Sequence, residues 1–207
     1  MPPSSVPAQH KRLVVASANP GKLSEFRHLL ADAPFALTSL GELGLPSPKE
    51  TGTTFLENAL LKARHAAASS GCAAIADDSG LEVDALGGAP GVHSARFAGP
   101  RADDAANNSK LIASLAELGP SGCPQGWPAR YRCVLVLMRG AHDPAPLTAE
   151  GVWEGAIVAT PRGAGGFGYD PHFWLPELQM TAGELDAERK NTLSHRGSAW
   201  RALRALL

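Results

Sequence analysis

Two adjacent carboxylates, Asp77 and Asp78, follow directly after a short apolar run at residues 72–76. A run this short is typical of a buried strand, and the Ser79-Gly80 pair that comes next predicts a turn. Unpaired carboxylates at the end of a buried strand repel each other and are costly to desolvate. A hard divalent cation such as Mg²⁺ would remove that conflict, because it prefers oxygen ligands. The pattern therefore predicts a metal site at a strand end, with an ordinary surface turn as the alternative.

Apolar runs and amphipathic segments alternate along the rest of the chain. The expected strands cover residues 13–16, 35–40, 72–76, 81–85, 131–138 and 147–158. Helices are expected from residue 22, over 54–70 and 103–118, after Thr181 and after Ser194. Strands interleaved with helices predict an α/β fold in which helices flank a mixed central β-sheet. The Pro- and Ser-rich opening predicts a disordered tail at residues 1–11, ahead of a single domain at 12–207.

The composition argues against several classes of protein. The chain has 207 residues, 44% of them hydrophobic, and a net charge of −1 at pH 7. This charge is not that of a protein built to coat nucleic acid, so no nucleic-acid partner is expected. No apolar stretch reaches the roughly 18 residues that span a membrane, and no signal peptide is expected. The three cysteines have no close pairing. We therefore expect core thiols in a reducing cytoplasm, not a disulfide or a zinc site.

Three further segments carry groups that suit an anionic ligand. Residues 17–22 form a turn that opens a helix with a lysine, although they lack the spacing of a Walker A loop. Residues 165–171 combine glycines, which allow close approach of the backbone, with two aromatic faces that suit a base. Lys190 and the Ser-His-Arg-Gly run at 194–197 add cations near a helix start. Each segment alone is also compatible with an ordinary turn, a hairpin loop or a solvated basic end.

The helix expected at 54–70 begins with a capping box formed by Thr54 and Glu57. Most of its apolar residues share one arc, and Asn58 and Lys62 lie one turn apart on the polar side. A polar helix face is normally solvated, so these two side chains indicate a site only together with the other segments.

Taken together and in this order, the motifs closely resemble those of the inosine triphosphate pyrophosphatase family. The matching stretches are Ser-Ala-Asn-Pro-Gly-Lys at 17–22, Glu-Thr-Gly-Thr-Thr-Phe-Leu-Glu-Asn-Ala at 50–59, Ala-Asp-Asp-Ser-Gly-Leu-Glu-Val-Asp at 76–84, Gly-Gly-Ala-Pro-Gly-Val-His-Ser-Ala-Arg at 87–96, Gly-Gly-Phe-Gly-Tyr-Asp-Pro at 165–171 and Ser-His-Arg-Gly at 194–197. The match extends from about residue 13 to the last expected helix. Several long motifs in one order are not expected by chance.

The resemblance implies two lobes that enclose a nucleotide-binding cleft, and a homodimer. It also implies a Mg²⁺-dependent enzyme that hydrolyses dITP, ITP and XTP to the monophosphate and pyrophosphate and so cleanses the nucleotide pool. Asp78 matches the family's proton acceptor and metal ligand, and Glu50 is the candidate for a second metal ligand. The positions that match substrate contacts are Ser17, Ala18, Asn19, Pro20, Gly21, Lys22, Ser79, Phe167, Gly168, Tyr169, Asp170, Lys190, His195 and Arg196.

These residues suggest how such a reaction would proceed. Asp78 and Glu50 would hold Mg²⁺ against phosphate oxygens, and Asp78, aided by Asp77, would activate a water molecule that attacks the α-phosphorus. Lys22 and Lys62 would neutralise the leaving pyrophosphate.

Selection of the base has a separate explanation. Donors from His195 and Arg196 would match the C6 oxygen of hypoxanthine or xanthine and stay unpaired against the amino group of adenine. Guanine carries the same oxygen, so its rejection requires a second check at the 2-amino group, for which residues 167–169 are the candidates.

Two other functions stay open on the sequence. A general nucleoside triphosphate pyrophosphatase with pyrimidine substrates would differ only in the nucleotides that it accepts. A catalytically silent nucleotide-binding regulator would be expected to lack a metal carboxylate, yet Asp77, Asp78 and Glu50 are all present.

Overall fold

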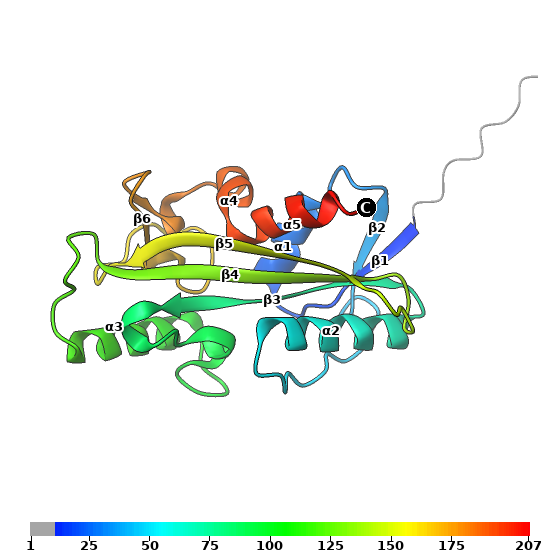
Figure 1. The fold of residues 1–207 in the computed structure, drawn as a ribbon, viewed down its shortest axis with the longest axis horizontal. Coiled ribbons are helices and arrows are strands. Elements are labelled where there is room, and N and C mark those ends of the chain that lie inside the picture. The colour runs from blue at the N-terminus through cyan, green and yellow to red at the C-terminus, as the bar shows by residue number, and fades with distance from the viewer. Residues whose placement is uncertain (1–10) are drawn as a thin grey trace, which may run out of the picture.

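A seven-stranded sheet runs through the centre of the molecule (Figure 1). The computed structural model describes residues 11–207. The strand order is β2-β1-β3-β4-β5-β6-β7; β1 is parallel to β2 and β3, and the other neighbouring pairs are antiparallel. The strands are β1 (Lys11–Val15), β2 (Phe35–Ser39), β3 (Ala73–Val83), β4 (Trp127–Met138), β5 (Leu147–Ile157), β6 (Phe173–Leu175) and β7 (Met180–Thr181). The predicted α/β fold with a mixed sheet is confirmed.

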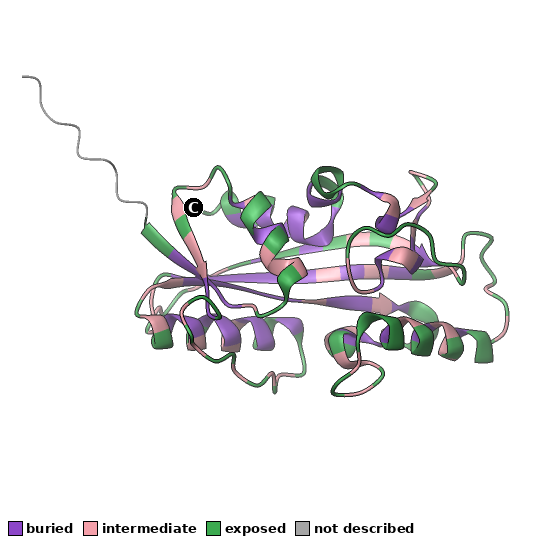
Figure 2. Cartoon of the chain, turned by 180° about the vertical axis from the view of Figure 1, so that it is seen from behind, coloured by how far each residue is buried: buried purple, intermediate pink, exposed green. Residues whose placement is uncertain are grey.

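Helices cover both faces of this sheet. In Figure 1, α1, α4 and α5 lie on one side, and α2 and α3 on the other. The α-helices are α1 (Pro20–Leu29), α2 (Phe55–Ser70), α3 (Asp104–Glu117), α4 (Ala187–Leu193) and α5 (His195–Arg204). The 3₁₀ helices are η1 (Asp84–Leu86), η2 (Gly91–Arg96), η3 (Asp170–His172) and η4 (Ala182–Glu184). Figure 2 shows buried residues concentrated in the strands and on the helix sides that face them.

Side-chain caps explain where the helices of the site begin. Asn19 caps α1 by accepting from the backbone N–H of Lys22, and Ser194 caps α5 in the same way through Gly197. The predicted capping box at the start of α2 is confirmed. Because a cap fixes the first turn of a helix, these residues also fix the side chains that the first turns carry.

The turn predicted at residues 77–80 is wrong, because β3 continues without interruption from Ala73 to Val83. Leu81 and Val83 extend the buried face that Ile75 begins, and β3 pairs with β4 over its whole second half. The two carboxylates therefore lie inside one continuous strand and not in a turn.

Three smaller predictions have mixed outcomes. β1 begins at Lys11, so the tail predicted at 1–11 overlaps it by one residue; the rest of that prediction lies outside the described residues. All three cysteines are free, but only Cys133 is fully buried; Cys72 is half-buried and Cys123 is exposed. Within residues 11–207, no helix combines the length and the apolarity needed to cross a membrane.

Candidate functional site

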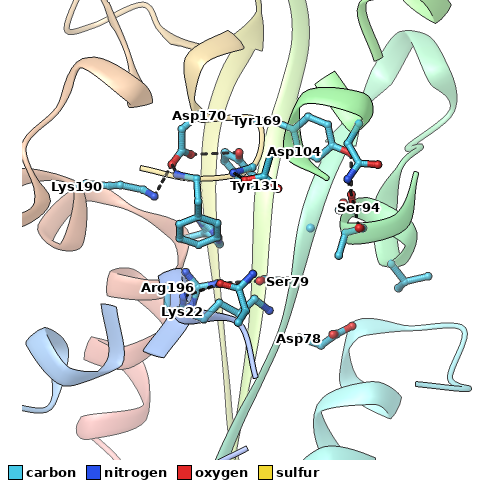
Figure 3. A pocket seen from close by; sticks show the side chains of 18 of the residues that line it. Lys22, Asp78, Ser79, Ser94, Asp104, Tyr131, Tyr169, Asp170, Lys190 and Arg196 are labelled. Atoms are coloured by element: carbon cyan, nitrogen blue, oxygen red, sulfur yellow. Dashed lines mark hydrogen bonds and ion pairs between the residues drawn. The ribbon is translucent and has the colours of Figure 1, made fainter. Parts of the chain in front are cut away.

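A cleft opens along the part of β3 that extends beyond β1. β1 pairs only with Ala73–Ile75, so the next residues of β3 have no strand on that side. The cleft has an empty volume of about 750 Å³, part of it open to solvent. Asp78, Ser79 and Gly80 lie along it, and the other walls come from α1, the loop before α2, η2, α3, β4, residues 167–170, α4 and α5 (Figure 3).

Most of the residues predicted for the site line this one cleft. They are Asn19, Lys22, Glu50, Asp78, Ser79, Phe167, Gly168, Tyr169, Asp170, Lys190, His195 and Arg196. Ser17, Ala18, Pro20, Gly21 and Lys62 do not line it. Ser17 instead shapes the turn before α1, since its hydroxyl accepts a hydrogen bond from the backbone of Asn19.

The adjacent carboxylates Asp77 and Asp78 do not face each other. Successive residues of a strand point to opposite faces of the sheet. Asp77 points toward α1 and α5, where it contacts Lys22 and Arg196. Asp78 points toward α2, as Figure 3 shows for its position across β3 from Lys22 and Arg196. The repulsion expected from their adjacency is therefore relieved by the strand geometry and by separate cations.

Lys62 holds the Asp78 side of the site together. Its ammonium nitrogen lies 2.6 Å from Asp78 Oδ1 and 2.7 Å from Glu50 Oε1. Asn58 donates to the second oxygen of Asp78 at 3.2 Å, and Arg96 binds the second oxygen of Glu50 at 3.0 Å. Burial raises the pKa of Asp78, although Lys62 opposes this effect. Asn58 and Lys62 are thus buried against the sheet rather than solvated.

The same cluster could hold a divalent cation. Two carboxylate oxygens, from Asp78 and Glu50, converge on one positive charge beside the cleft. Within residues 11–207 there is no group of three or more side chains with the chemistry to bind a metal by themselves. Mg²⁺ commonly takes one or two carboxylates and completes its shell with water and phosphate oxygens. The donor set therefore fits Mg²⁺ bound together with a phosphorylated ligand.

Asp77, which is itself buried, is the centre of a second cluster. Its Oδ2 lies 2.8 Å from Lys22 Nζ and 2.9 Å from Arg196 Nη2, and Ser79 donates to the same oxygen. Burial opposes ionisation, but Lys22 and Arg196 together outweigh it and hold the pKa of Asp77 well below its usual range. Asp77 is absent from the lining of the cleft. It positions two cations instead of meeting a ligand.

Glu25 joins this cluster to the far end of the cleft, and sequence reasoning missed it. Its carboxylate forms ion pairs with Arg196 and, at 2.9 Å, with Lys190. Burial opposes its ionisation, yet these two cations lower the pKa of Glu25 overall. The signal that could have revealed it is its position three residues after Lys22, on the same side of α1.

Asp170 organises the aromatic end of the cleft. Its Oδ2 lies 2.6 Å from Lys190 Nζ and accepts the backbone N–H of Phe167 at 2.8 Å, and its Oδ1 accepts the hydroxyl of Tyr131 at 3.2 Å. The Lys190 ammonium also lies 4.4 Å from the centre of the Phe167 ring, a cation–π contact. Residues 167–170 therefore form a fixed wall.

His195 presents a neutral imidazole to the cleft. Burial lowers its pKa well below the ordinary value, and the charges of Arg196 and Lys190 lower it further. Among the described residues, its Nδ1 is buried without a hydrogen-bond partner. The first turn of α5 reaches this place because Gly151 of β5 has no side chain: a Cβ there would lie 2.0 Å from the His195 carbonyl oxygen.

The turn before α1 meets the aromatic segment through Gly21 and Phe167. A Cβ on Gly21 would lie 2.5 Å from Cδ1 of the Phe167 ring, so the ring occupies the space that a side chain would need. The turn before α1 and the aromatic segment are therefore packed directly against each other.

Other lining residues were not predicted. They are Gly80, Val92, Ser94, Ala95, Asp104, Asn107 and Tyr131. Ser94 and Tyr131 had detectable signals, since Ser94 lies in one of the motifs and Tyr131 is the polar start of an apolar run. Asp104 and Asn107 had none, because polar residues in the first turn of a helix are ordinary.

Comparisons with known proteins agree with this geometry. The model of the Ham1 family matches residues 13–206. A protein from Methylococcus capsulatus named dITP/XTP pyrophosphatase is 54% identical over 191 residues, which cover 91% of this chain and 92% of that protein. A solved HAM1 protein from Coxiella burnetii has a TM-score of 0.85 and 46% identity, covering 95% of this chain and 98% of its own. A structure from Mycobacterium abscessus, titled nucleoside-triphosphatase / dITP/XTP pyrophosphatase, has a TM-score of 0.70 and 41% identity, with coverage of 95% and 98%.

Proposed function

Because the chain belongs to the Ham1 family, we propose that it hydrolyses dITP, ITP and XTP to the nucleoside monophosphate and pyrophosphate. The oxygen of a water molecule bonds to the α-phosphorus. The bond from that phosphorus to the oxygen that bridges to the β-phosphorus breaks, and pyrophosphate leaves with the bridging oxygen. The activity would remove these purine nucleotides from the nucleotide pool.

One observation carries the proposal: a single cleft joins a pair of carboxylates to an aromatic wall that includes a histidine. Asp78 and Glu50 meet at Lys62, whereas Phe167 packs against Lys190 and His195 stacks on Tyr131. A triphosphate with a flat base has the same division, because its phosphates need cations and its ring needs stacking and hydrogen bonds.

Asp78 and Glu50 would hold Mg²⁺, which when bound neutralises phosphate oxygens and makes a bound water more acidic. Asp78 accepts the proton of the attacking water. Lys22 and Lys62 offset the charge of the departing pyrophosphate. Asp77 is not expected to act on that water, since it points to the other face of the sheet toward Lys22 and Arg196.

His195 is the better candidate for contact with the C6 oxygen of the base. Arg196 already binds Asp77, Glu25 and Ser79 through its guanidinium and is 1% exposed. His195 Nδ1, in contrast, lacks a partner among the described residues. A site that must hydrogen-bond the C6 oxygen rejects adenine, because its buried donor would be left unpaired. Residues 167–169 remain the candidates for rejecting the 2-amino group of guanine.

The assay that tests the function measures the product and the substrate together. Purified protein is given dITP, ITP, XTP, the four ordinary deoxynucleotides and a pyrimidine panel, with Mg²⁺ or with EDTA. Pyrophosphate and orthophosphate are measured separately. We expect pyrophosphate from dITP, ITP and XTP in Mg²⁺ and none in EDTA. Equal turnover of pyrimidine nucleotides would favour the general pyrophosphatase, and binding without turnover would favour the regulator.

We further propose that the protein acts as a homodimer in the cytoplasm. Light scattering coupled to gel filtration would test the first statement, since a mass near that of one chain contradicts it. Cell fractionation would test the second.

A further inference from the structure

We propose that Tyr131 is a positioning residue for base recognition, which orients Asp170 through its hydroxyl and His195 through its ring. The inference rests on the proposed function, because that function assigns the aromatic end of the cleft to the base. Tyr131 itself was not among the residues predicted for the site, and it lies on β4, next to β3 in the sheet.

The hydroxyl of Tyr131 completes the hydrogen bonding of Asp170. It donates to Oδ1 at 3.2 Å, while Lys190 and the backbone of Phe167 bind Oδ2 at 2.6 and 2.8 Å (Figure 3). The side chain of Asp170 is 3% exposed, so no bulk water replaces a missing donor. Both oxygens are thus occupied, and the plane of the carboxylate is defined from two sides.

The ring of Tyr131 supports the imidazole of His195. The two ring centres lie 4.7 Å apart with an angle of 11° between the planes. Phe173 packs against the same Tyr131 ring at 4.6 Å, and Trp153 lies 6.5 Å away on the neighbouring strand. The tyrosine is therefore held in place by the sheet and by its neighbours, and its ring restricts the orientation of the His195 imidazole.

One side chain consequently sets the spacing between the two polar groups at the base end. If the hydroxyl is removed, Asp170 Oδ1 is left buried without its donor, and the carboxylate is free to turn. If the ring is removed, His195 loses the surface on which it lies. Loss of the hydroxyl should therefore make residues 167–170 less rigid, and loss of the ring should make His195 less rigid.

Two variants separate these contributions. Tyr131→Phe keeps the ring and removes only the hydroxyl, whereas Tyr131→Leu removes both. The matched control is Thr181→Val, which removes the buried hydroxyl that donates to the carbonyl of Arg162 outside the cleft. Steady-state kinetics with dITP and dATP give KM, kcat and the preference between the bases, and the ring-current shift of the His195 proton signals is read by NMR without substrate.

We expect Tyr131→Phe to raise KM for dITP by about tenfold with little change in kcat, and to weaken the preference for dITP over dATP. Tyr131→Leu should lower kcat/KM further and lose the upfield shift of His195, which Tyr131→Phe retains. Thr181→Val should leave the KM and the preference unchanged. An unaltered KM and preference in Tyr131→Phe, or an unaltered His195 signal in Tyr131→Leu, would overturn the inference. Failure of the wild-type protein to hydrolyse any purine nucleotide would refute the proposed function instead. The NMR comparison needs no substrate, so it would still show whether the Tyr131 ring lies against His195.

Discussion

The ammonium nitrogen of Lys62 lies 2.6 Å from Oδ1 of Asp78, directly behind the cleft that Asp78 lines. The same nitrogen lies 2.7 Å from Glu50. A positive charge thus lies between the two carboxylates that would hold Mg²⁺. A metal ion and this ammonium repel each other at such distances, so Lys62 opposes metal binding until a phosphate is present to attract it.

Replacement of Lys62 by methionine should therefore have opposite effects on metal binding and on catalysis. Without the ammonium, Asp78 and Glu50 should bind Mn²⁺ about tenfold more tightly in the absence of nucleotide, since one charge at contact distance is worth about 1–4 kcal/mol. Hydrolysis of dITP should fall, because the phosphates lose a cation. Isothermal titration with Mn²⁺ measures the first effect.

Lys22→Met is the matched control for that measurement. Lys22 also contacts a carboxylate, but that carboxylate is Asp77, on the other side of β3. Its loss should tighten Mn²⁺ binding less than the loss of Lys62 does, because Lys22 makes no contact with Asp78 or Glu50 and acts on them only through space. Equal tightening in both variants, or none in Lys62→Met, would contradict the competition between the ammonium and the metal.

Asp78→Asn should reduce the release of pyrophosphate from dITP by about 10²–10⁴-fold, the usual contribution of a general base. Asparagine keeps the size of the side chain, so the protein should remain folded by circular dichroism. Glu154→Gln, which removes an exposed carboxylate paired with Arg130, serves as the control and should retain full activity. Near-normal turnover in Asp78→Asn would remove Asp78 from the reaction.

Asp77→Asn should instead act on stability. The change leaves Lys22 and Arg196 without their shared buried partner, and we expect a loss of about 3–5 kcal/mol in the free energy of unfolding at pH 7. The loss should depend on pH in a defined direction. The ordinary pKa of this carboxyl is 3.8 and the folded value is lower, so the ionised group stabilises the protein above about pH 4 and progressively less below it.

Urea unfolding at pH 7 and pH 3 tests this expectation. The difference between the wild type and Asp77→Asn should be large at pH 7 and smaller at pH 3. Asp84→Asn, which breaks an exposed ion pair with Arg130, should cost no more than about 1 kcal/mol. A gap that widens toward acid would mean that Asp77 is not held in its ionised form.

Gly21→Ala should displace the Phe167 ring, although Gly21 itself lies in the segment expected to bind the phosphates. The added methyl group would meet the Phe167 ring at 2.5 Å and displace it, so KM for dITP should rise by about tenfold or more. Alanine favours helices, and the first turn of α1 should not be weakened. Gly140→Ala is the control, because no heavy atom lies within 4 Å of a Cβ at that position. An unchanged KM in Gly21→Ala would show that the Phe167 ring moves aside freely.

Local signals in the sequence were sufficient for much of the architecture. The cap at Thr54 and Glu57 marks the start of α2, and the apolar run that begins at Tyr131 marks the core of β4. These features depend on neighbouring residues only, so they can be recognised without the fold. The same holds for the motifs that line the cleft, which are continuous stretches of the chain.

The local rules failed where contacts from distant segments outweigh propensity. Aspartate and glycine are poor strand formers, so residues 77–80 looked like a turn. Arg196, 119 residues away, neutralises Asp77 and allows β3 to continue. The stack of Tyr131 on His195 likewise depends on how α5 lies against the sheet, and no pattern near Tyr131 could indicate it.

The seating of α5 against β5 has a consequence for biosynthesis. Arg196 is separated by 171 residues from its partner Glu25 and follows every other element of the cleft in chain order. While the ribosome is still making the preceding segments, Asp77 and Glu25 have no guanidinium to neutralise them. A nascent chain in which α5 has not yet emerged should consequently lack the guanidinium and the imidazole that this helix contributes to the cleft, so we expect nucleotide binding only once α5 is in place.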